Sequence, residues 1–337
     1  MRHCGIDIHA RTSELCEVSR QGKVIRQERF STTQAGYRRR FEGVARMRVV
    51  VESGGSTPWI ARLLEELGHE VVVVNPRRMR LIAESTLKCD RLDAEILARL
   101  SRLDVELLRP VYQRSEEGQQ LRTQLRVRSS LVQARTALIN QVRGTLRAQG
   151  APMGSCASKS FVARWAAHRM SRTLRDLLEP LAGAIGELTE RIETLEKQLV
   201  ELSRSDELLE RLQEVPGVGP LVSLSFVGWV DRAERFATSR DIGACLGLRP
   251  KLRESGGKSH CGSITREGDN EMRWLLVQAA HAALAVRRDS ALKRWAELLM
   301  KRVGKRKAVV ALARKLGVLL HRLWVSGESY RPFPQVA

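Results

Sequence analysis

The chain has 337 residues, of which 43% are hydrophobic and 28% charged, so it is long enough for two or three domains with sizeable cores. Its net charge of +20 favours a polyanionic partner, and nucleic acid fits better than a lipid surface because no lipid anchor is evident. No apolar run approaches the ~20 residues of a membrane span. The first residues lack the apolar segment of a signal peptide, so we expect a cytoplasmic protein without a membrane partner.

The six cysteines are scattered along the chain, at Cys4, Cys16, Cys89, Cys156, Cys245 and Cys261. None forms a CxxC pair, and none has a histidine at the spacing of a zinc site. This pattern predicts a reduced compartment and excludes a structural zinc centre or a disulfide framework.

The N-terminal third predicts an α/β domain over residues 1–113. Alternating polar and apolar residues predict a three-stranded antiparallel meander at 3–8, 13–19 and 23–30. Continuous apolar runs at 49–52 and 70–75 predict buried parallel strands. Helices are predicted at 34–45, 57–67, 77–83 and 92–103. The order β-β-β-α-β-α-β-α is that of the RNase H-like (RuvC-like) fold.

Four acidic residues fall where this fold places its working site, beyond the carboxyl ends of the strands. Asp7 lies in the first strand, Glu52 ends the fourth, and Asp90 and Asp93 are three residues apart, on one face of a helix. Single acids at strand ends are often turn formers or helix caps, and an acidic DxxD pair is often a solvated helix face. Four together predict a site for two Mg²⁺ ions roughly 3.5–4 Å apart, with Mn²⁺ able to substitute.

The middle segment, residues 114–207, predicts long helices. Its second half carries a heptad seam of Leu181, Ile185, Leu188, Ile192, Leu195, Leu199 and Leu202. One interpretation is two antiparallel helices that pack within one chain. The interpretation we favour is a coiled coil with a second protomer, because the seam is long and regular.

Residues 208–337 predict a mainly α-helical C-terminal domain. A turn at 215–220 resembles a helix-hairpin-helix, in which Gly217 and Gly219 would let backbone N–H groups approach a DNA phosphate. Such a turn also serves as a plain connector. The end of the chain is basic helix, suited to contact with a nucleic-acid backbone.

Ser255 lies in a glycine-rich loop between Arg253 and Lys258. Its hydroxyl is a candidate nucleophile, with the adjacent cations stabilising a pentavalent phosphate, although a turn serine is the simpler interpretation. Arg266 and Arg273 are further candidates for phosphate contact. His281 either faces the same phosphate or lines a DNA groove.

Two ordered sets of motifs resemble the DEDD transposases of bacterial insertion sequences, which are related to the Piv-type DNA invertases. The N-terminal set is Gly5-Ile6-Asp7-Ile8, Val51-Glu52-Ser53-Gly54-Gly55, Val74-Asn75-Pro76 and Lys88-Cys89-Asp90-Arg91-Leu92-Asp93-Ala94. The C-terminal set is Pro216-Gly217-Val218-Gly219, Gly247-Leu248-Arg249-Pro250, Ser255-Gly256-Gly257-Lys258 and Arg266-Glu267-Gly268-Asp269-Asn270 with Arg273. Cys89 and Glu267 depart from the family's pattern, but neither replaces a proposed ligand or nucleophile.

The resemblance implies a composite active site in which the DEDD metal site and the serine act together and form a covalent phosphoserine intermediate with DNA. It also implies donor and target DNA, a structured guide RNA encoded by the element, and a homo-oligomer, dimer or tetramer. One alternative is a Mg²⁺-dependent structure-selective endonuclease like a Holliday-junction resolvase, which would use the acids but not Ser255 and would not need the C-terminal third. The other is a non-catalytic nucleic-acid-binding scaffold, against which the complete acid set argues.

Overall fold

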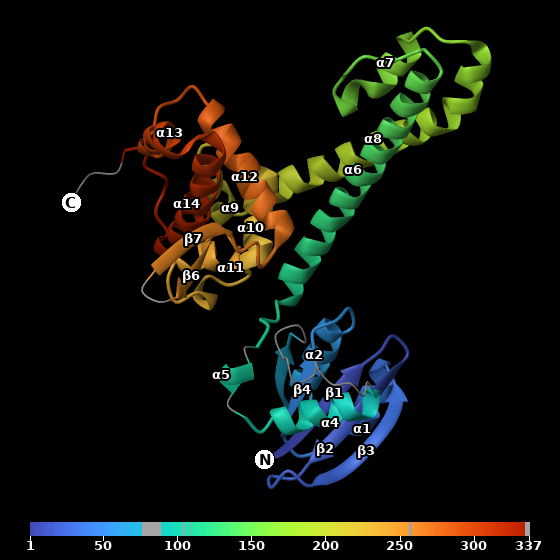
Figure 1. The fold of residues 1–337 in the computed structure, drawn as a ribbon. Coiled ribbons are helices and arrows are strands. Elements are labelled where there is room, and N and C mark those ends of the chain that lie inside the picture. The colour runs from blue at the N-terminus through green and yellow to red at the C-terminus, as the bar shows by residue number, and fades with distance from the viewer. Residues whose placement is uncertain (76–88, 104, 109, 256–257, 334–337) are drawn as a thin grey trace. The chain divides into compact units, whose positions relative to one another are not determined.

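The computed structural model describes residues 1–75, 89–103, 105–108, 110–255 and 258–333 (Figure 1). The chain forms two compact units, Met1–Arg114 and Ser115–Ala337. The helix predicted at 77–83 lies outside the described residues. A further separation of 114–207 from 208–337 stays a prediction.

The N-terminal unit is built on a five-stranded mixed sheet in the order β3-β2-β1-β4-β5. The strands β1, β2 and β3 pair antiparallel, as the meander predicted, and β4 and β5 join β1 in parallel. Their bounds are Arg2–Ile8 (β1), Thr12–Val18 (β2), Val24–Ser31 (β3), Met47–Glu52 (β4) and Glu70–Val74 (β5). A mixed sheet follows because the hairpins need only short turns, whereas the parallel strands are joined through helices.

Helices cover both faces of this sheet. Side chains alternate between the faces of a strand, so Val49 and Val51 pack with Ile60 on one side, and Val50 packs with Leu97 on the other. The helices of this unit are Gln34–Phe41 (α1), Thr57–Glu66 (α2), Asp90–Leu100 (α4) and Val105–Leu108 (α5). Helix α1 ends four residues before the predicted end, because Glu42 turns extended and Gly43 adopts φ 70°.

Helix α4 lies directly against β1 because Gly5 has no side chain. A Cβ at Gly5 would lie 2.2 Å from the carbonyl oxygen of Ala94 and 2.2 Å from the amide nitrogen of Ala98. The buried alanines of α4 complete this close approach. The first turn of α4 is thereby held close to the end of β1.

The second unit begins with a helical arm, residues 116–204, in which two long helices run side by side (Figure 1). Ile139, Val142 and Leu146 of one helix pack with Leu178, Ala182 and Ile185 of the other, while Arg128 nearer the start of α6 bonds Glu196 nearer the end of α8, so the helices are antiparallel. The arm consists of Glu116–Ala148 (α6), Phe161–Ala167 (α7) and Arg172–Arg204 (α8).

The seam predicted on α8 separates into two stripes, each with seven-residue spacing. Ile185, Ile192 and Leu199 are buried. The other stripe, formed by Leu181, Leu188, Leu195 and Leu202, is only partly buried, and Leu202 is 41% exposed. The within-chain interpretation therefore accounts for the first stripe. The predicted contact with a second protomer remains a prediction for the second stripe.

The rest of the second unit is a mainly α-helical body around one apolar core that includes Leu212, Phe226, Leu276 and Leu316. Helix α8 ends at Arg204, and a new helix begins at Glu207, where Asp206 is the cap. The elements are Glu207–Gln213 (α9), Pro220–Val230 (α10), Asp241–Cys245 (α11), Pro250–Ser255 (β6), Lys258–Ile264 (β7), Asn270–Ala285 (α12), Ala291–Val303 (α13) and Lys305–Ser326 (α14).

Two carboxylates attach the base of the arm to this body. Asp231, at the end of α10, accepts hydrogen bonds from the amide of Ser115 at 3.0 Å and from its hydroxyl at 2.6 Å. Asp269, the cap of α12, forms an ion pair with Arg122 of α6 at 2.7 Å. None of the helices in the described part of the chain combines the length and apolar character of a membrane span.

Candidate active site

The side chain of Asp7 lies near the end of β1 and is 14% exposed, whereas that of Asp90 is 43% exposed. Burial raises the pKa of Asp7, the nearby His9 opposes that shift, and the charges of Asp90 and Asp93 add to it. Carboxylates that raise one another's pKa in this way lie close enough to share a cation.

Glu52 ends β4, the parallel neighbour of β1. Burial raises its pKa, and Asp7 and Asp93 raise it further. The turn after β4 is fixed because the Thr57 hydroxyl donates to the carbonyl of Glu52 at 2.6 Å and accepts from the amide of Gly54 at 2.8 Å. The backbone that carries Glu52 is thus held in place at the end of β4.

Asp90 and Asp93 both lie in the first turn of α4, which begins two residues earlier than predicted. The positive end of the helix dipole favours carboxylates at this position. Asp90 is 43% exposed and contacts the imidazole of His9 and the guanidinium of Arg29. The four carboxylates predicted from the sequence therefore come from three elements: the carboxyl ends of the neighbouring strands β1 and β4, and the first turn of α4.

His9 and Arg29 are members of this site that sequence reasoning missed. His9 Nε2 lies 3.1 Å from Asp7 Oδ2 and 3.1 Å from Asp90 Oδ2. Arg29 bonds both Glu14 and Asp90. The only sequence signal was the position of His9 two residues after Asp7, where side chains of extended chain share a face.

The donor set of the site fits a divalent cation. One ligand atom each from Asp7, His9 and Asp90 lies within 4.8 Å of the others. Beside them an open depression of about 550 Å³ is lined by Glu14, Gln27, Glu28, Arg29, Cys89, Asp90 and Arg91. The carboxylates can hold a cation, and the depression leaves room beside it for a phosphate.

The predicted nucleophile, Ser255, is the last residue of β6 and stands opposite Lys258 in the antiparallel pair β6–β7. Arg253 stands opposite His260 in the same pair. The connection 256–257 and the side chains of 253–261 lie outside the described part of the chain. The roles of Ser255, Arg253 and Lys258 therefore stay predictions.

Arg273 is only 9% exposed, and its guanidinium is engaged by its own chain. It donates to the carbonyls of Leu246 at 2.8 Å and Glu267 at 3.1 Å, and to the side chain of Asn270 at 2.8 Å. These bonds tie the loop after α11 to the start of α12. Arg266, by contrast, is exposed. The geometry favours a positioning role for Arg273 and leaves Arg266 accessible to a phosphate.

The two glycines of the predicted helix-hairpin-helix turn differ in surroundings. Gly217 adopts φ 84°, and a Cβ there would lie 2.2 Å from the carbonyl oxygen of Ala279, so this glycine lets the turn pack on α12. A Cβ at Gly219 would meet no atom within 4 Å. Phosphate contact through this turn stays a prediction, and Gly219 is the residue with open space for it.

Two family profiles and several known proteins are similar to this chain. A profile described as "Transposase", of the IS110 DEDD type, matches residues 4–149, and one described as "Transposase IS116/IS110/IS902 family" matches 209–296. The transposase for insertion sequence element IS1111A of Coxiella burnetii is 30% identical over 97% of this chain and 90% of that protein. A protein of Pseudomonas aeruginosa named a probable family 20 transposase is 31% identical, over 97% and 98%. The chain belongs to the IS116/IS110/IS902 transposase family.

Membership in this transposase family implies an enzyme that acts on DNA by cutting and rejoining it. The transposase for insertion sequence element IS1328 of Yersinia enterocolitica is also similar, 30% identical over 82% of both chains. The DEDD domain belongs to the RNase H-like superfamily, as the element order predicted, and implies a divalent metal at its carboxylates.

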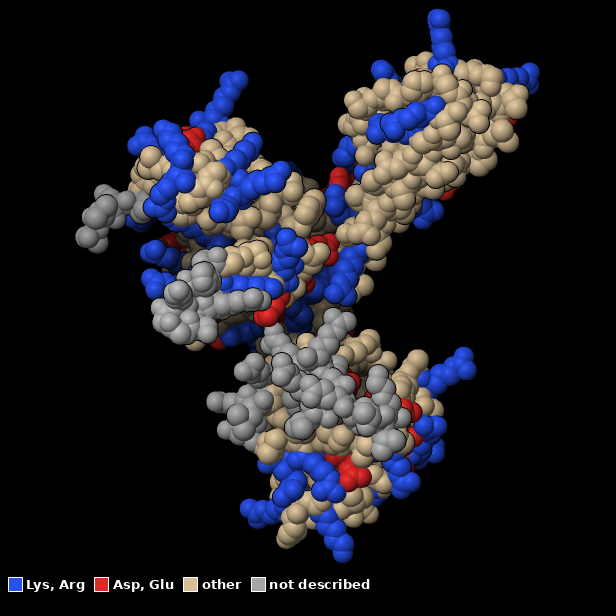
Figure 2. Space-filling view, viewed as in Figure 1, with Lys and Arg blue, Asp and Glu red and all other residues tan. Residues whose placement is uncertain are grey.

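The transposase also presents an exposed face of α12, which includes the predicted His281 and a tryptophan that the sequence analysis did not single out. Trp274 is 57% exposed, and Gln278 and His281 follow it at helical spacing on the same accessible side. Lys and Arg are spread over the visible face of this part of the chain (Figure 2). Exposed basic residues that continue from α12 into α13 and α14 are Arg287, Arg288, Arg294, Lys301, Arg302, Lys305, Arg306 and Lys307.

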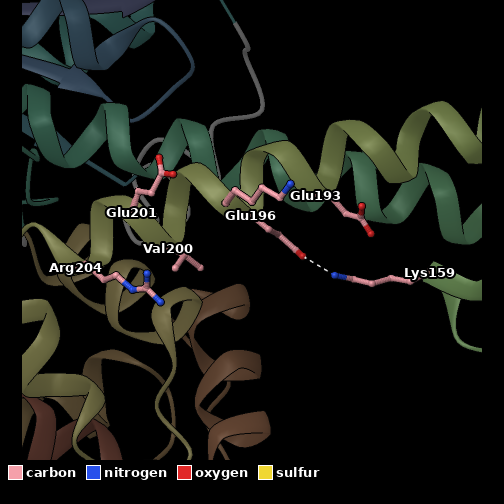
Figure 3. Close-up of a pocket in the computed structure, with 7 residues that line it drawn as sticks. Lys159, Glu193, Glu196, Val200, Glu201 and Arg204 are labelled. Carbon is pink, nitrogen blue, oxygen red and sulfur yellow. Dashed lines mark hydrogen bonds and ion pairs between the residues drawn. The ribbon is translucent and has the colours of Figure 1, made fainter.

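A second open pocket, of about 380 Å³, lies on the helical arm, where Lys159 approaches Glu196 at 3.2 Å (Figure 3). Glu196 also bonds Arg128 at 2.6 Å, so its charge is already compensated. The lining alternates acids and bases at helical spacing, with Val200 as its apolar member. Self-paired charges of this kind describe a solvated helix surface rather than a ligand site.

Proposed function

We propose that this transposase cuts and rejoins DNA with Mg²⁺ held by Asp7, Glu52, Asp90 and Asp93 and with Ser255 as the nucleophile. The observation that carries the metal part is that Asp7 and Asp90, with His9, each offer a ligand atom within 4.8 Å of the others. Glu52 and Asp93 extend this donor set, since the charges of Asp7 and Asp93 add to the burial that raises the pKa of Glu52. Carboxylates that lie together repel one another, and a divalent cation relieves that repulsion. The family places the same chain among enzymes of DNA transposition.

In this proposal the Ser255 hydroxyl attacks a backbone phosphorus. The Oγ–P bond forms as one P–O ester bond of the DNA breaks. The serine proton passes to a base, and the leaving oxygen takes up a proton, so the leaving strand departs as a free hydroxyl. Bound Mg²⁺ supplies stabilisation of the charge that develops on the phosphate oxygens. The ester keeps the phosphate activated, so a second strand hydroxyl can displace serine and rejoin DNA without ATP.

The proposed partners are donor DNA, target DNA and a structured guide RNA. The net charge of +20 and the exposed basic residues of α13 and α14 support a polyanionic partner. The accessible indole of Trp274 supports contact with unstacked bases. Nucleic acid that co-purifies with the protein should contain a discrete RNA when it is sequenced. Recovery of DNA alone would remove the guide RNA from the proposal.

The proposed assembly is a homo-oligomer, dimer or tetramer. Its support is the second leucine stripe of α8, Leu181, Leu188, Leu195 and Leu202, which the arm's own pairing leaves partly exposed. A stripe at seven-residue spacing is typical of a helix that meets another helix along its length. An oligomer would also allow Ser255 of one protomer to act with the carboxylates of another.

The deciding experiment follows labelled DNA on a denaturing gel after incubation with Mg²⁺. Wild type should give a covalent protein–DNA adduct and recombinant product. Ser255→Ala should bind DNA normally and give neither. Asp90→Asn should also bind DNA and fail to cut, and excess EDTA should stop wild type. An adduct that survives in Ser255→Ala would show that the nucleophile lies elsewhere, and metal-dependent cutting without any adduct would favour the simple endonuclease.

A further inference from the structure

The carboxylates are not arranged evenly around Asp7. Glu52 ends β4, which pairs with β1 and its Asp7, and Asp93 lies in the first turn of α4, so these three side chains offer only oxygen donors. His9 Nε2 lies 3.1 Å from Asp7 and 3.1 Å from Asp90, so the second group contains a nitrogen. Asp7 is common to both groups. The site therefore offers two chemically different sets of donors.

Two hydrogen bonds fix the backbone of His9. Its amide donates to the carbonyl of Thr12 at 2.9 Å, and its carbonyl accepts from the hydroxyl of Thr32 at 2.9 Å. These bonds fix the turn between β1 and β2 from both sides. Ligands that are positioned by rigid backbone lose little freedom when they bind a metal.

A single atom, Nε2 of His9, faces both carboxylates. A ring nitrogen carries at most one proton, so it cannot donate a full hydrogen bond to each. A cation between the carboxylates can be bound by all three groups at once, and the ligand atoms already lie within 4.8 Å of one another. The arrangement thus suits coordination at least as well as a pair of hydrogen bonds.

We propose that His9 is a nitrogen ligand of one of the two metal positions, which makes the two positions unequal in metal preference. This inference rests on the metal site of the proposed function. Mg²⁺ takes oxygen ligands almost exclusively, whereas imidazole is a ligand for first-row transition metals. The position at Asp7, Glu52 and Asp93 therefore suits Mg²⁺, and the position at Asp7, His9 and Asp90 favours Mn²⁺.

The test uses Mn²⁺ alone as the probe, on the full-length protein. Pulsed electron paramagnetic resonance detects the ¹⁴N nucleus of an imidazole bound to Mn²⁺. Wild type should show this nitrogen signal, and His9→Ala should lose it. His281→Ala is the matched control, because His281 is an exposed histidine on α12 in the second unit, and it should keep the signal.

Calorimetric titration supplies the second readout. His9→Ala should weaken Mn²⁺ binding at one position roughly tenfold or more, in the range known for losing one part of a metal site, while Mg²⁺ binding changes less. His9→Asp replaces nitrogen by oxygen and should move the preference of that position toward Mg²⁺. His9 is 46% exposed, so both variants are expected to fold, and circular dichroism checks this.

The outcomes separate this inference from the proposed function. If wild type binds Mn²⁺ without a nitrogen signal, or if His9→Ala keeps the signal, His9 is not a ligand and the carboxylate site stands. If wild type binds neither Mn²⁺ nor Mg²⁺, the metal site of the proposed function fails together with this inference. A nitrogen signal that depends on His9 supports both.

Discussion

Asp7 is destabilising to the folded chain when no metal is bound. Burial raises its folded pKa above the ordinary value of 3.8, so the folded state binds the proton more tightly than the unfolded state. The free energy of unfolding is therefore lowered at every pH above the raised pKa. The loss is recovered as the pH falls through the raised pKa, and it is absent below 3.8.

Asp7→Asn should consequently raise the free energy of unfolding at pH 7 in the presence of a chelator, on the order of 0.5–1 kcal/mol after solvent screening. The gain should shrink as the pH is lowered toward 4. Added Mg²⁺ should stabilise wild type but not the variant, because only wild type binds it. Thermal unfolding measures these changes in stability. Asp176→Asn is the control, because it alters an exposed carboxylate that pairs with Arg172. An Asp7→Asn protein less stable than wild type at pH 7 with chelator would contradict it.

Trp274 offers a second prediction at the residue scale. An indole that is 57% exposed is suited to stack on an unpaired base. Trp274→Ala should weaken binding of single-stranded DNA by about 1–3 kcal/mol, which is about 5- to 150-fold, whereas Trp274→Phe should retain most of the affinity. Fluorescence anisotropy measures both. Equal affinity of the alanine variant and wild type would show that this face of α12 does not contact bases.

The acids of the site could be predicted from the sequence, because each stands at the end of an apolar run or in one helix turn. His9 and Arg29 could not. Arg29 of β3 reaches Glu14 because the two residues are opposite in the register of β2 and β3, and register is a property of the folded sheet. The burial of Arg273 could not be predicted either, because it depends on loop residues distant in the sequence, such as Leu246. From the sequence alone, Arg273 was therefore a candidate for phosphate contact.

At the scale of elements, the seam of α8 shows where the sequence was insufficient. Leucines and isoleucines at alternating three- and four-residue steps predict a helix with an apolar side, and α8 is that helix. The same pattern cannot say which of these residues α6 covers and which stay partly exposed. Arg135 of α6 is a second feature that the pattern does not predict. It is 6% exposed and lies opposite Thr189, so an arginine is buried inside the arm where an apolar residue would be expected.

The second stripe of α8 can be tested apart from the first. Leu188→Glu with Leu195→Glu places charges on the partly exposed stripe, so it should convert an oligomer to monomers with little loss of thermal stability. Val127→Glu, at a 48% exposed position of α6, is the control and should leave the assembly intact. Light scattering gives the number of chains per particle. A wild-type protein that is already monomeric at micromolar concentration, with nucleic acid present, would refute the oligomer.

For the whole molecule, the charge of +20 predicts steeply salt-dependent DNA binding. Each phosphate neutralised by Lys or Arg should lower the logarithm of the affinity by about 0.9 per tenfold increase in salt. Combined replacement of Lys305, Arg306 and Lys307 by alanine should reduce the slope by up to about three such contacts. Titration at several salt concentrations measures it, and an unchanged slope would mean that the start of α14 does not bind the backbone.

The carboxylate of Asp231 has a consequence for how the chain is made. It accepts hydrogen bonds from Ser115, the N-cap of α6, although 116 residues separate the two. During synthesis on the ribosome, the first turn of the arm therefore lacks its hydrogen-bond acceptor until Asp231 has been made, after the arm itself. Arg122 lacks its ion-pair partner until the later residue Asp269 has been made. The unit Met1–Arg114 contains all of its own core and needs neither. We expect the unit Met1–Arg114 to fold first. The two long helices of the arm should pair next, and Ser115 and Arg122 should both have their partners only when α12 has been synthesised. Protease digestion of nascent chains stalled before and after these positions would reveal that sequence.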